Sequence, residues 1–352
     1  MYARTQIRIP TLVRIKRGAL GRLGTYLRRC GIGPALVLTS PLPKALEQKA
    51  RAAVANTSGA GVAITDWICI DDSSFEEAVR IFGSLPKKVA AIVGIGGGKA
   101  LDMAKYVAFL AGKPYIAVPT SLSNDGFCSP QASLTFGGKR RSLPAAMPQC
   151  LVLDVGVCLD APKNLWLSGV GDLVSKFTAV RDWKLAFRKN GEHVDDLAAL
   201  LSDASVYQFL AAPTFDEAGV ALLGTALMLN GISMEICGSS RPASGSEHLI
   251  SHALDAISER PRLHGLQVGV ASYIISRLQG KHSDTINQLF RQTGFWEEIC
   301  KDPFSRAEWL EAVRMAPSIK EDFYTILSVR DRLPEIARML DQDPVLRNCF
   351  TA

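Results

Sequence analysis

Short runs of apolar residues alternate with helical patterns along the first part of the chain. The runs are rich in β-branched side chains and several end at a proline, which is typical of buried strands. They predict four strands, at Ala35–Thr39, Val62–Ile70, Val89–Val93 and Tyr115–Val118. Helical patterns lie between them, at Leu42–Val54, after the capping-box pattern Ser73–Glu77, and at Lys99–Ala111. This alternation predicts helices on both faces of a mostly parallel sheet, with ligands at the carboxyl ends of the strands.

The pattern changes near residue 160. Beyond it, long amphipathic or fully apolar helical stretches predominate, and breaks such as Pro213 separate them. We therefore predict an α/β, Rossmann-like domain over residues 1–160 and an all-helical domain over residues 161–352. The uncharged stretch Ala218–Met234 contains three glycines and Asn230, so it predicts a buried helix and no membrane span.

Composition and charge narrow the class of protein. At 352 residues the chain is long enough for two domains, and 47% apolar with 21% charged residues describes a globular protein. The net charge of +6 is spread along the chain, and basic clusters such as Lys139–Arg141 lack interleaved aromatics. We therefore expect no nucleic-acid partner, whereas a small anionic substrate is compatible. Eight cysteines without a CxxC pair predict reduced thiols in the cytoplasm, and Met1–Leu23 lacks a signal-peptide pattern.

Three of the five histidines fall within one short stretch. His248 and His252 are four residues apart, so on a helix both imidazoles lie on one face, as a metal or a reacting substrate requires. Ser244–Glu247, just before, is typical of a helix N-cap. Pro261 predicts a helix end before His264, which would then reach the site from a separate element. Ordinary histidines satisfied by local hydrogen bonds are the alternative.

A run of glycines follows the third predicted strand and opens a helix. In Gly94–Asp102 the glycines let the backbone approach a pyrophosphate, and the helix N-terminus presents free amides to it. The run differs from the GxGxxG fingerprint because Lys99 stands where the last glycine would be, and it lacks the Gly-Lys-Ser/Thr ending of a P-loop. Its context favours phosphate binding over the alternative, a tight turn without a ligand.

Two further stretches carry polar groups. Pro119–Gly126 follows the fourth predicted strand, where its hydroxyls and carboxylate would bond a nicotinamide ribose or a polyol, unless it is a plain polar turn. Asp172 follows two glycines, which would clear space for a ligand, and we expect it at the start of a helix. There it is either a charge favoured by the helix dipole or, with His248 and His264, the third ligand of a Zn²⁺-like catalytic site with open positions.

Taken together, the sequence resembles the sn-glycerol-1-phosphate dehydrogenases, within the superfamily of iron-containing alcohol dehydrogenases, glycerol dehydrogenases and 3-dehydroquinate synthases. The resemblance rests on five stretches in matching order and spacing: Gly94–Asp102, Pro119–Pro130, Gly169–Lys176, Gly245–Asp255 and His264–Val270. It implies a dehydroquinate synthase-like fold and reversible, NAD(P)H-dependent reduction of dihydroxyacetone phosphate to sn-glycerol 1-phosphate. It also implies a role in phospholipid biosynthesis and a homo-oligomer of two or more copies.

The resemblance assigns roles by motif. The dinucleotide, NAD or NADP, would be held by Gly96, Gly97, Gly98, Lys99, Ala100, Leu101, Asp102, Thr120, Ser121, Leu122, Ser123 and Ser129. One divalent metal, Zn²⁺ with Ni²⁺ or Fe²⁺ as alternatives, would be held by Asp172, His248 and His264. Asp125 would contact the substrate, and Asp172 would bind both metal and substrate. Spacing alone makes His252 a second ligand, whereas the family pattern makes it a catalytic substrate contact beside the metal.

Two departures from the family pattern bear on specificity. Leu266 stands where many relatives carry a polar or acidic residue, so the substrate end would be altered. The strand at Ala35–Thr39 is followed by no carboxylate for a ribose 2′-hydroxyl, so we expect NADP to be accepted as readily as NAD. Three rivals stay open: a sugar-phosphate cyclase or lyase of the dehydroquinate-synthase kind, a polyol dehydrogenase acting on unphosphorylated glycerol, and a non-catalytic paralogue.

Overall fold

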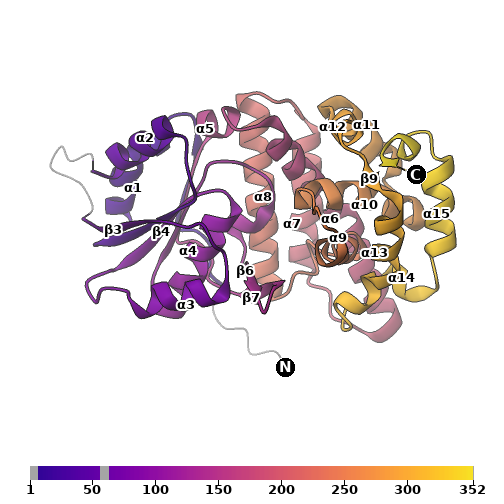
Figure 1. The fold of residues 1–352 in the computed structure, drawn as a ribbon, viewed down its shortest axis with the longest axis horizontal. Helices are drawn as coiled ribbons and strands as arrows, with labels where there is room; N and C mark the ends of the chain where they lie inside the picture. Colours follow the sequence, from indigo (N-terminus) through magenta and orange to yellow (C-terminus); the bar gives the residue numbers. More distant parts are fainter. Residues whose placement is uncertain (1–6, 56–62, 352) are drawn as a thin grey trace. The chain divides into compact units, whose positions relative to one another are not determined.

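The computed structural model describes residues 7–55 and 63–351, and these fold as two compact units that divide between Pro162 and Lys163. The first unit is built on a six-stranded parallel sheet in the order β1-β8-β5-β4-β2-β3 (Figure 1). Its strands are β1 (Leu12–Lys16), β2 (Ala35–Thr39), β3 (Ile64–Cys69), β4 (Ala91–Gly96), β5 (Tyr115–Pro119) and β8 (Cys150–Asp154). An antiparallel hairpin of β6 (Gln131–Phe136) and β7 (Lys139–Pro144) forms a separate small sheet.

Helices cover both faces of this sheet, as the alternating pattern predicts. They are η1 (Leu20–Arg22), α1 (Leu23–Arg29), α2 (Lys44–Ala55), α3 (Phe75–Gly83), α4 (Gly98–Ala111), η2 (Asp125–Cys128) and α5 (Val155–Leu159). On one face, Tyr26 of α1 and Val54 of α2 share a core with Val37 and Val93 of the sheet. Helices α3 and α4 lie on the other face (Figure 1). Strands β2, β4, β5 and β8 are buried along their whole length because of this double cover.

Two strands of the sheet were not predicted. They are β8, which lies between β1 and β5 and is apolar from Cys150 to Leu153, and the edge strand β1 at Leu12–Lys16. The third strand begins at Ala91, two residues later than predicted, and extends through Gly96 into the glycine run. Of the predicted strand at Val62–Ile70, Val62 lies outside the described residues.

The order of strands places a switch point between β2 and β4. From β2 the chain moves outward to β3, then returns to β4 and continues through β5 in the opposite direction. In open α/β sheets, ligands bind beyond the carboxyl ends of the strands at such a point. Ser40 follows β2 there and Gly97 follows β4, so the fold brings the predicted phosphate-binding turn to this position.

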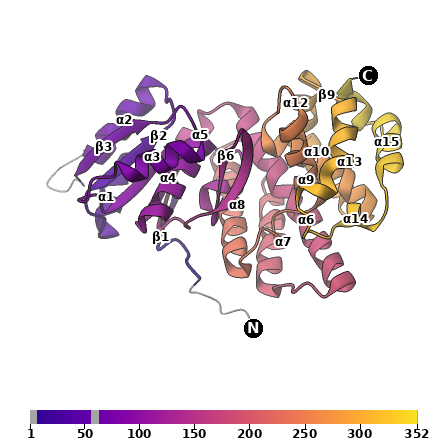
Figure 2. The same cartoon turned by 60° about the horizontal axis from the view of Figure 1, so that its bottom comes forward.

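The second unit consists mainly of helices (Figure 2). They are α6 (Lys163–Asn190), α7 (Asp196–Leu210), α8 (Glu217–Cys237), α9 (Ser246–Ile257), α10 (His264–Gln279), α11 (Ser283–Thr293), α12 (Phe295–Lys301), α13 (Arg306–Ile319), α14 (Ile326–Val329), α15 (Leu333–Gln342) and η3 (Leu346–Asn348). Two strands of two residues each, β9 (Phe304–Ser305) and β10 (Phe350–Thr351), pair in parallel. Helix α10 packs against both α6 and α9, and this three-helix contact carries the predicted metal ligands.

Helix α8 contains the stretch for which we predict burial without a membrane span. Among the described residues, it is the helix that is long and apolar enough to cross a membrane by length and composition. Half of its most apolar window is buried inside the protein, and core helices commonly meet the same criterion.

Candidate active site

Asp172 lies in the middle of helix α6, which corrects the expectation that it starts a helix. The helix begins at Lys163, more than two turns earlier, so the positive end of the helix dipole does not account for the carboxylate. Asp172 is 1% exposed. A carboxylate so deeply buried in a helix needs compensating charges or donors, and α9, α10 and the next turn of α6 supply them.

Gly171, the glycine directly before Asp172, serves a different purpose from the predicted one. A Cβ atom on Gly171 would lie 2.0 Å from the carbonyl oxygen of Gly265, and one on Gly265 would lie 1.8 Å from that of Ser168. Gly171 therefore makes room for helix α10 and not for a ligand. The Gly265 amide also donates to the Ser168 hydroxyl at 3.1 Å. This close helix crossing brings His264, the first residue of α10, beside Asp172.

The start of helix α9 is also capped differently from the prediction. Its N-cap, Gly245, makes no side-chain capping bond. Instead, the buried carboxylate of Asp182 on α6 accepts both the backbone amide of Ser246 at 2.9 Å and its hydroxyl at 2.5 Å. Asp182 also accepts the Ile326 amide at 3.0 Å and the Gln279 side chain at 2.9 Å. One acid thus joins the starts of α9 and α14 to α6, which sequence spacing does not reveal.

Asp172, His248 and His264, the three residues predicted to bind a metal, lie close together. The Nε2 atoms of His248 and His264 lie 3.4 and 3.9 Å from Oδ1 of Asp172, and the three ligand atoms lie within 4.8 Å of one another. Ligands at usual zinc bond lengths around a tetrahedral ion are about 3.3–3.5 Å apart. Two imidazoles and a carboxylate at these separations therefore fit a divalent transition metal, with further coordination positions open.

The charges around Asp172 favour the ionised form of its carboxyl group, which is the form that binds a cation. Burial opposes its ionisation, but Lys176 and His248 together hold the pKa of the Asp172 carboxyl below its usual value. The Lys176 ammonium, fully buried one turn later on α6, lies 3.6 Å from Oδ2 of Asp172. For His248, burial lowers the pKa, whereas hydrogen bonds to Asp172 and Glu247 raise it, and the net shift is upward. Asp172 is therefore a carboxylate at neutral pH.

His252 lies beside Asp172, His248 and His264, but it is not one of these three residues. Its ring centroid is 5.6 Å from that of His264 and 6.3 Å from that of His248. Together with Asp255 and His264, His252 forms a second, less buried group within metal-binding distance. His264 itself contacts the Ser251 hydroxyl through Nδ1 at 3.1 Å, which leaves its Nε2 on the side of Asp172.

The predicted phosphate-binding turn has the backbone that such a turn requires. Gly96 has a φ of +147°, and a Cβ there would lie 2.5 Å from the Ser40 hydroxyl oxygen. Gly97 is the N-cap of α4 without a side-chain cap, so the first amides of α4 have no side-chain acceptor from that residue. A Cβ on Gly98 would meet nothing within 4 Å, which leaves room for a ligand beside the helix start.

The other residues assigned to the dinucleotide fall into two groups. Lys99 is exposed, and Thr120, Ser121 and Ser123 are partly exposed on the loop after β5. Five are buried: Ala100, Leu101, Asp102, Leu122 and Ser129. Of these, Asp102 pairs with Lys105 at 3.3 Å, and the Ser129 hydroxyl donates to the carbonyls of Gly126 and Gln131.

Lys105, which sequence reasoning did not single out, joins these groups. Its fully buried ammonium donates to the carbonyl oxygens of Gly126 and Gln131 and lies 3.4 Å from the Ser129 hydroxyl. It thereby ties the loop that carries Asp125, on η2, to helix α4. A lysine among apolar neighbours on a helix is the sequence signal for such a role, but its partners are set by the tertiary structure.

Two alanine substitutions in the turn should have opposite effects on stability. Gly96→Ala should destabilise the protein by about 1–3 kcal/mol, because alanine is strained at the positive φ of this residue and its methyl group would meet Ser40.

Gly98→Ala should keep or raise the stability of the protein, since alanine favours a helix and its methyl group has room there. It should nevertheless weaken NADH binding at least ~10-fold, because its methyl group occupies the space for the pyrophosphate. Chemical denaturation and NADH fluorescence titration measure both. Unchanged NADH affinity in Gly98→Ala would argue against phosphate binding at this turn.

The buried acid Asp182 should give the protein a distinctive pH dependence of stability. Burial and the nearby Glu247 carboxylate raise its pKa from 3.8 to about 6. The folded state then binds the proton more tightly than the unfolded state, so this group stabilises the fold at low pH and loses that effect as pH rises through 6. The difference in unfolding free energy between wild type and Asp182→Asn should fall by about 1 kcal/mol from about pH 5 to pH 8. Parallel denaturation curves at both pH values test this, and a constant difference would contradict it.

Comparisons with known proteins show the family to which the chain belongs. A sequence model of the family described as iron-containing alcohol dehydrogenase matches residues 14–162. The chain is 34% identical to a glycerol-1-phosphate dehydrogenase [NAD(P)+] of Metallosphaera sedula, over 92% of this chain and 93% of that protein. It is also 34% identical to that of Aeropyrum pernix, over 95% and 96% of the two chains. The crystal structure of glycerol dehydrogenase from Schizosaccharomyces pombe shares the fold, with a TM-score of 0.76 at 20% identity over 99% and 92% of the two chains. The chain therefore belongs to the glycerol-1-phosphate dehydrogenase family of the iron-containing alcohol dehydrogenases.

Proposed function

We propose that the protein catalyses the reversible, NAD(P)H-linked reduction of dihydroxyacetone phosphate to sn-glycerol 1-phosphate, with one bound divalent metal. The observation that carries the proposal is the convergence of Asp172, His248 and His264 from three helices. Relatives named glycerol-1-phosphate dehydrogenase [NAD(P)+], similar over nearly the whole chain, supply the substrate and the cofactor. The product would place the enzyme in phospholipid biosynthesis, and the scattered cysteines support a cytoplasmic location.

Different residues of the chain would have different roles in this reaction. Asp172, His248 and His264 would hold the metal, which when bound acts as a Lewis acid toward the ketone oxygen. The turn at Gly97–Lys99 and the start of α4 would hold the pyrophosphate of the dinucleotide. Asp125 would contact the substrate, and His252, beside His264, would supply the proton that the reduced oxygen needs. The segment after β2, Ser40-Pro41, has no carboxylate, so NADPH should serve as well as NADH.

We propose Zn²⁺ as the metal, because two imidazoles and one carboxylate with open positions form a donor set typical of catalytic zinc. The same donors accept Ni²⁺ or Fe²⁺, so the identity is a matter for measurement. Metal analysis of protein purified without chelator, followed by reloading of stripped protein with each ion, decides among them. Full activity of the stripped protein would contradict a catalytic metal.

One assay separates this function from its rivals. Metal-loaded protein is incubated with NADH or NADPH and either dihydroxyacetone phosphate or dihydroxyacetone, and cofactor oxidation is followed at 340 nm. Oxidation with the phosphate ester alone supports the proposal, and equal oxidation with dihydroxyacetone points to a polyol dehydrogenase. Without oxidation of either, a cyclase or lyase of the dehydroquinate-synthase kind, or a non-catalytic paralogue, becomes the better account.

A further inference from the structure

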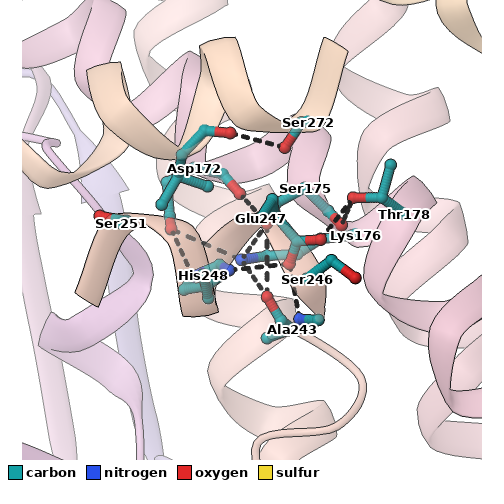
Figure 3. A network of polar contacts seen from close by, with 12 residues as sticks. Asp172, Ser175, Lys176, Thr178, Ala243, Ser246, Glu247, His248, Ser251 and Ser272 are labelled. Atoms are coloured by element: carbon teal, nitrogen blue, oxygen red, sulfur yellow. Dashed lines mark hydrogen bonds and ion pairs between the residues drawn. The ribbon is translucent and has the colours of Figure 1, made fainter. Parts of the chain in front are cut away.

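Glu247, next to the metal ligand His248, has its carboxylate fully buried and held by three donors (Figure 3). Oε1 accepts the Gly245 amide at 2.6 Å and contacts Nδ1 of His248 at 2.9 Å. Oε2 accepts the Thr178 hydroxyl at 2.8 Å. Consecutive residues on a helix usually direct their side chains apart. Here the side chain of Glu247 bends back over the first turn of α9, where it meets both the Gly245 amide and the imidazole.

This contact fixes the protonation pattern of the His248 ring. A carboxylate only accepts hydrogen bonds, so Nδ1 must carry the hydrogen. The doubly protonated ring also carries a hydrogen on Nε2, 3.4 Å from Asp172, whereas the neutral ring that binds a metal has its lone pair on that atom. Carboxylate partners of this kind orient histidine ligands and raise their basicity in metal sites. His264 differs, since its Nδ1 faces the hydroxyl of Ser251.

Glu247 also changes the charge balance beneath the site. Asp172 and Lys176 are both buried, and their charges cancel. A divalent cation held by Asp172 and two neutral imidazoles would then leave two positive charges among the ion, its ligands and Lys176, which is costly in a buried place. The Glu247 carboxylate removes one of them. It does so without contacting the ion, because the imidazole of His248 lies between.

We propose that Glu247 is a positioning residue of the metal site, which sets the tautomer and direction of the His248 ring and supplies the second negative charge that a divalent ion needs there. The inference rests on the proposed metal site at Asp172, His248 and His264. In the sequence, this residue is visible only as the glutamate of a Glu-His dipeptide at the start of α9. By itself, such a glutamate is typical of the first turn of a helix.

The test compares metal affinity in wild type, Glu247→Gln and Thr178→Val. Glutamine has the shape of glutamate and can still accept from Nδ1, but it lacks the charge. Thr178→Val is the matched control, because it removes a donor to the other oxygen of the same carboxylate and leaves the charge and the His248 contact in place. Zn²⁺ affinity is measured by competition with a chelator at one fixed pH, and the ligand field is followed by the absorption spectrum of bound Co²⁺. The melting temperature of each metal-free protein reports the effect on the fold.

Glu247→Gln should bind Zn²⁺ roughly 10–100-fold more weakly than wild type and show an altered Co²⁺ spectrum. Thr178→Val should stay within about 3-fold of wild type and keep the wild-type spectrum. Equal affinity and spectrum in Glu247→Gln and Thr178→Val would overturn the inference while leaving the metal site in place. If wild type itself binds no metal, or binds it equally well after His264→Ala, the proposed metal site fails instead. Should Glu247→Gln not fold, Glu247→Asp keeps the charge but draws it back from Nδ1, and unchanged affinity there also overturns the inference.

Discussion

His264→Ala should abolish turnover while leaving the dinucleotide site intact. The substitution removes one of three ligands and leaves the buried pairs Asp172–Lys176 and Glu247–His248 in place. Metal affinity should fall at least roughly 100-fold, because two ligands hold a divalent ion far less well than three. Loss of Lewis-acid stabilisation worth several kcal/mol should lower kcat by roughly 10³-fold or more. Steady-state assays, chelator competition and NADH titration measure the three quantities, and NADH affinity should stay within about 2-fold of wild type.

Two other histidines make this test specific. His193 is exposed, and His193→Ala should leave both metal affinity and turnover unchanged. His252→Ala should lower turnover but keep the metal, because His252 is assigned to the substrate and not to ligation. Loss of metal in His252→Ala, with retention in His264→Ala, would favour the His248–His252 pair that spacing alone suggests. It would contradict the cluster with Asp172.

Asp172→Asn should reduce the stability of the fold more than His264→Ala does, in addition to abolishing activity. Its neutral amide would remove the negative charge that lies 3.6 Å from the buried ammonium of Lys176. Breaking a buried ion pair from one side costs about 3–5 kcal/mol. We therefore expect lower stability as well as lost activity, which is why His264→Ala is the cleaner test of ligation.

The sequence predicts the two-part architecture because its signals are local. Apolar runs alternate with helical spacing up to Pro119, and each run is long enough to be recognised by itself. Strand β1 was missed because Leu12–Lys16 carries charged side chains on one side, as an edge strand of the sheet can. Strand β8 is buried along its whole length, as β2 is, and its first four residues are apolar, so the signal was present at Cys150–Asp154.

The sequence predicts the candidate metal ligands, but it does not predict the contacts that hold these residues in place. Residue type points to Asp172 and the histidines, because few side chains bind transition metals, and the family resemblance selects His264 in place of His252, the residue that spacing alone favours. The capping of α9 by Asp182 joins residues 64 apart in the chain, and the bond between Thr178 and Glu247 joins residues 69 apart. Such contacts depend on how α6 packs against α9. A single sequence shows these residues only as polar positions on helices.

Gly265→Ala should disrupt the site through the fold. The added methyl group would lie 1.8 Å from the carbonyl oxygen of Ser168, a backbone atom that moves only if helices α6 and α10 separate. Overpacking of this kind costs about 1–3 kcal/mol, and we expect the upper end or beyond because backbone faces backbone. His264 precedes Gly265, so separation of the helices also withdraws its imidazole from Asp172. Metal affinity and the denaturation midpoint should therefore fall together.

The control for this prediction is a helical glycine with space around it. Gly83 ends helix α3, and a Cβ there would meet nothing within 4 Å, so Gly83→Ala should leave stability and metal affinity unchanged. If Gly265→Ala kept wild-type stability, the helices would have to part at no cost, which close-packed interiors do not allow. If it lost stability but kept metal affinity, His264 would be held beside Asp172 by contacts other than the helix crossing. The Ser251 hydroxyl, 3.1 Å from Nδ1 of His264, would then be the first candidate.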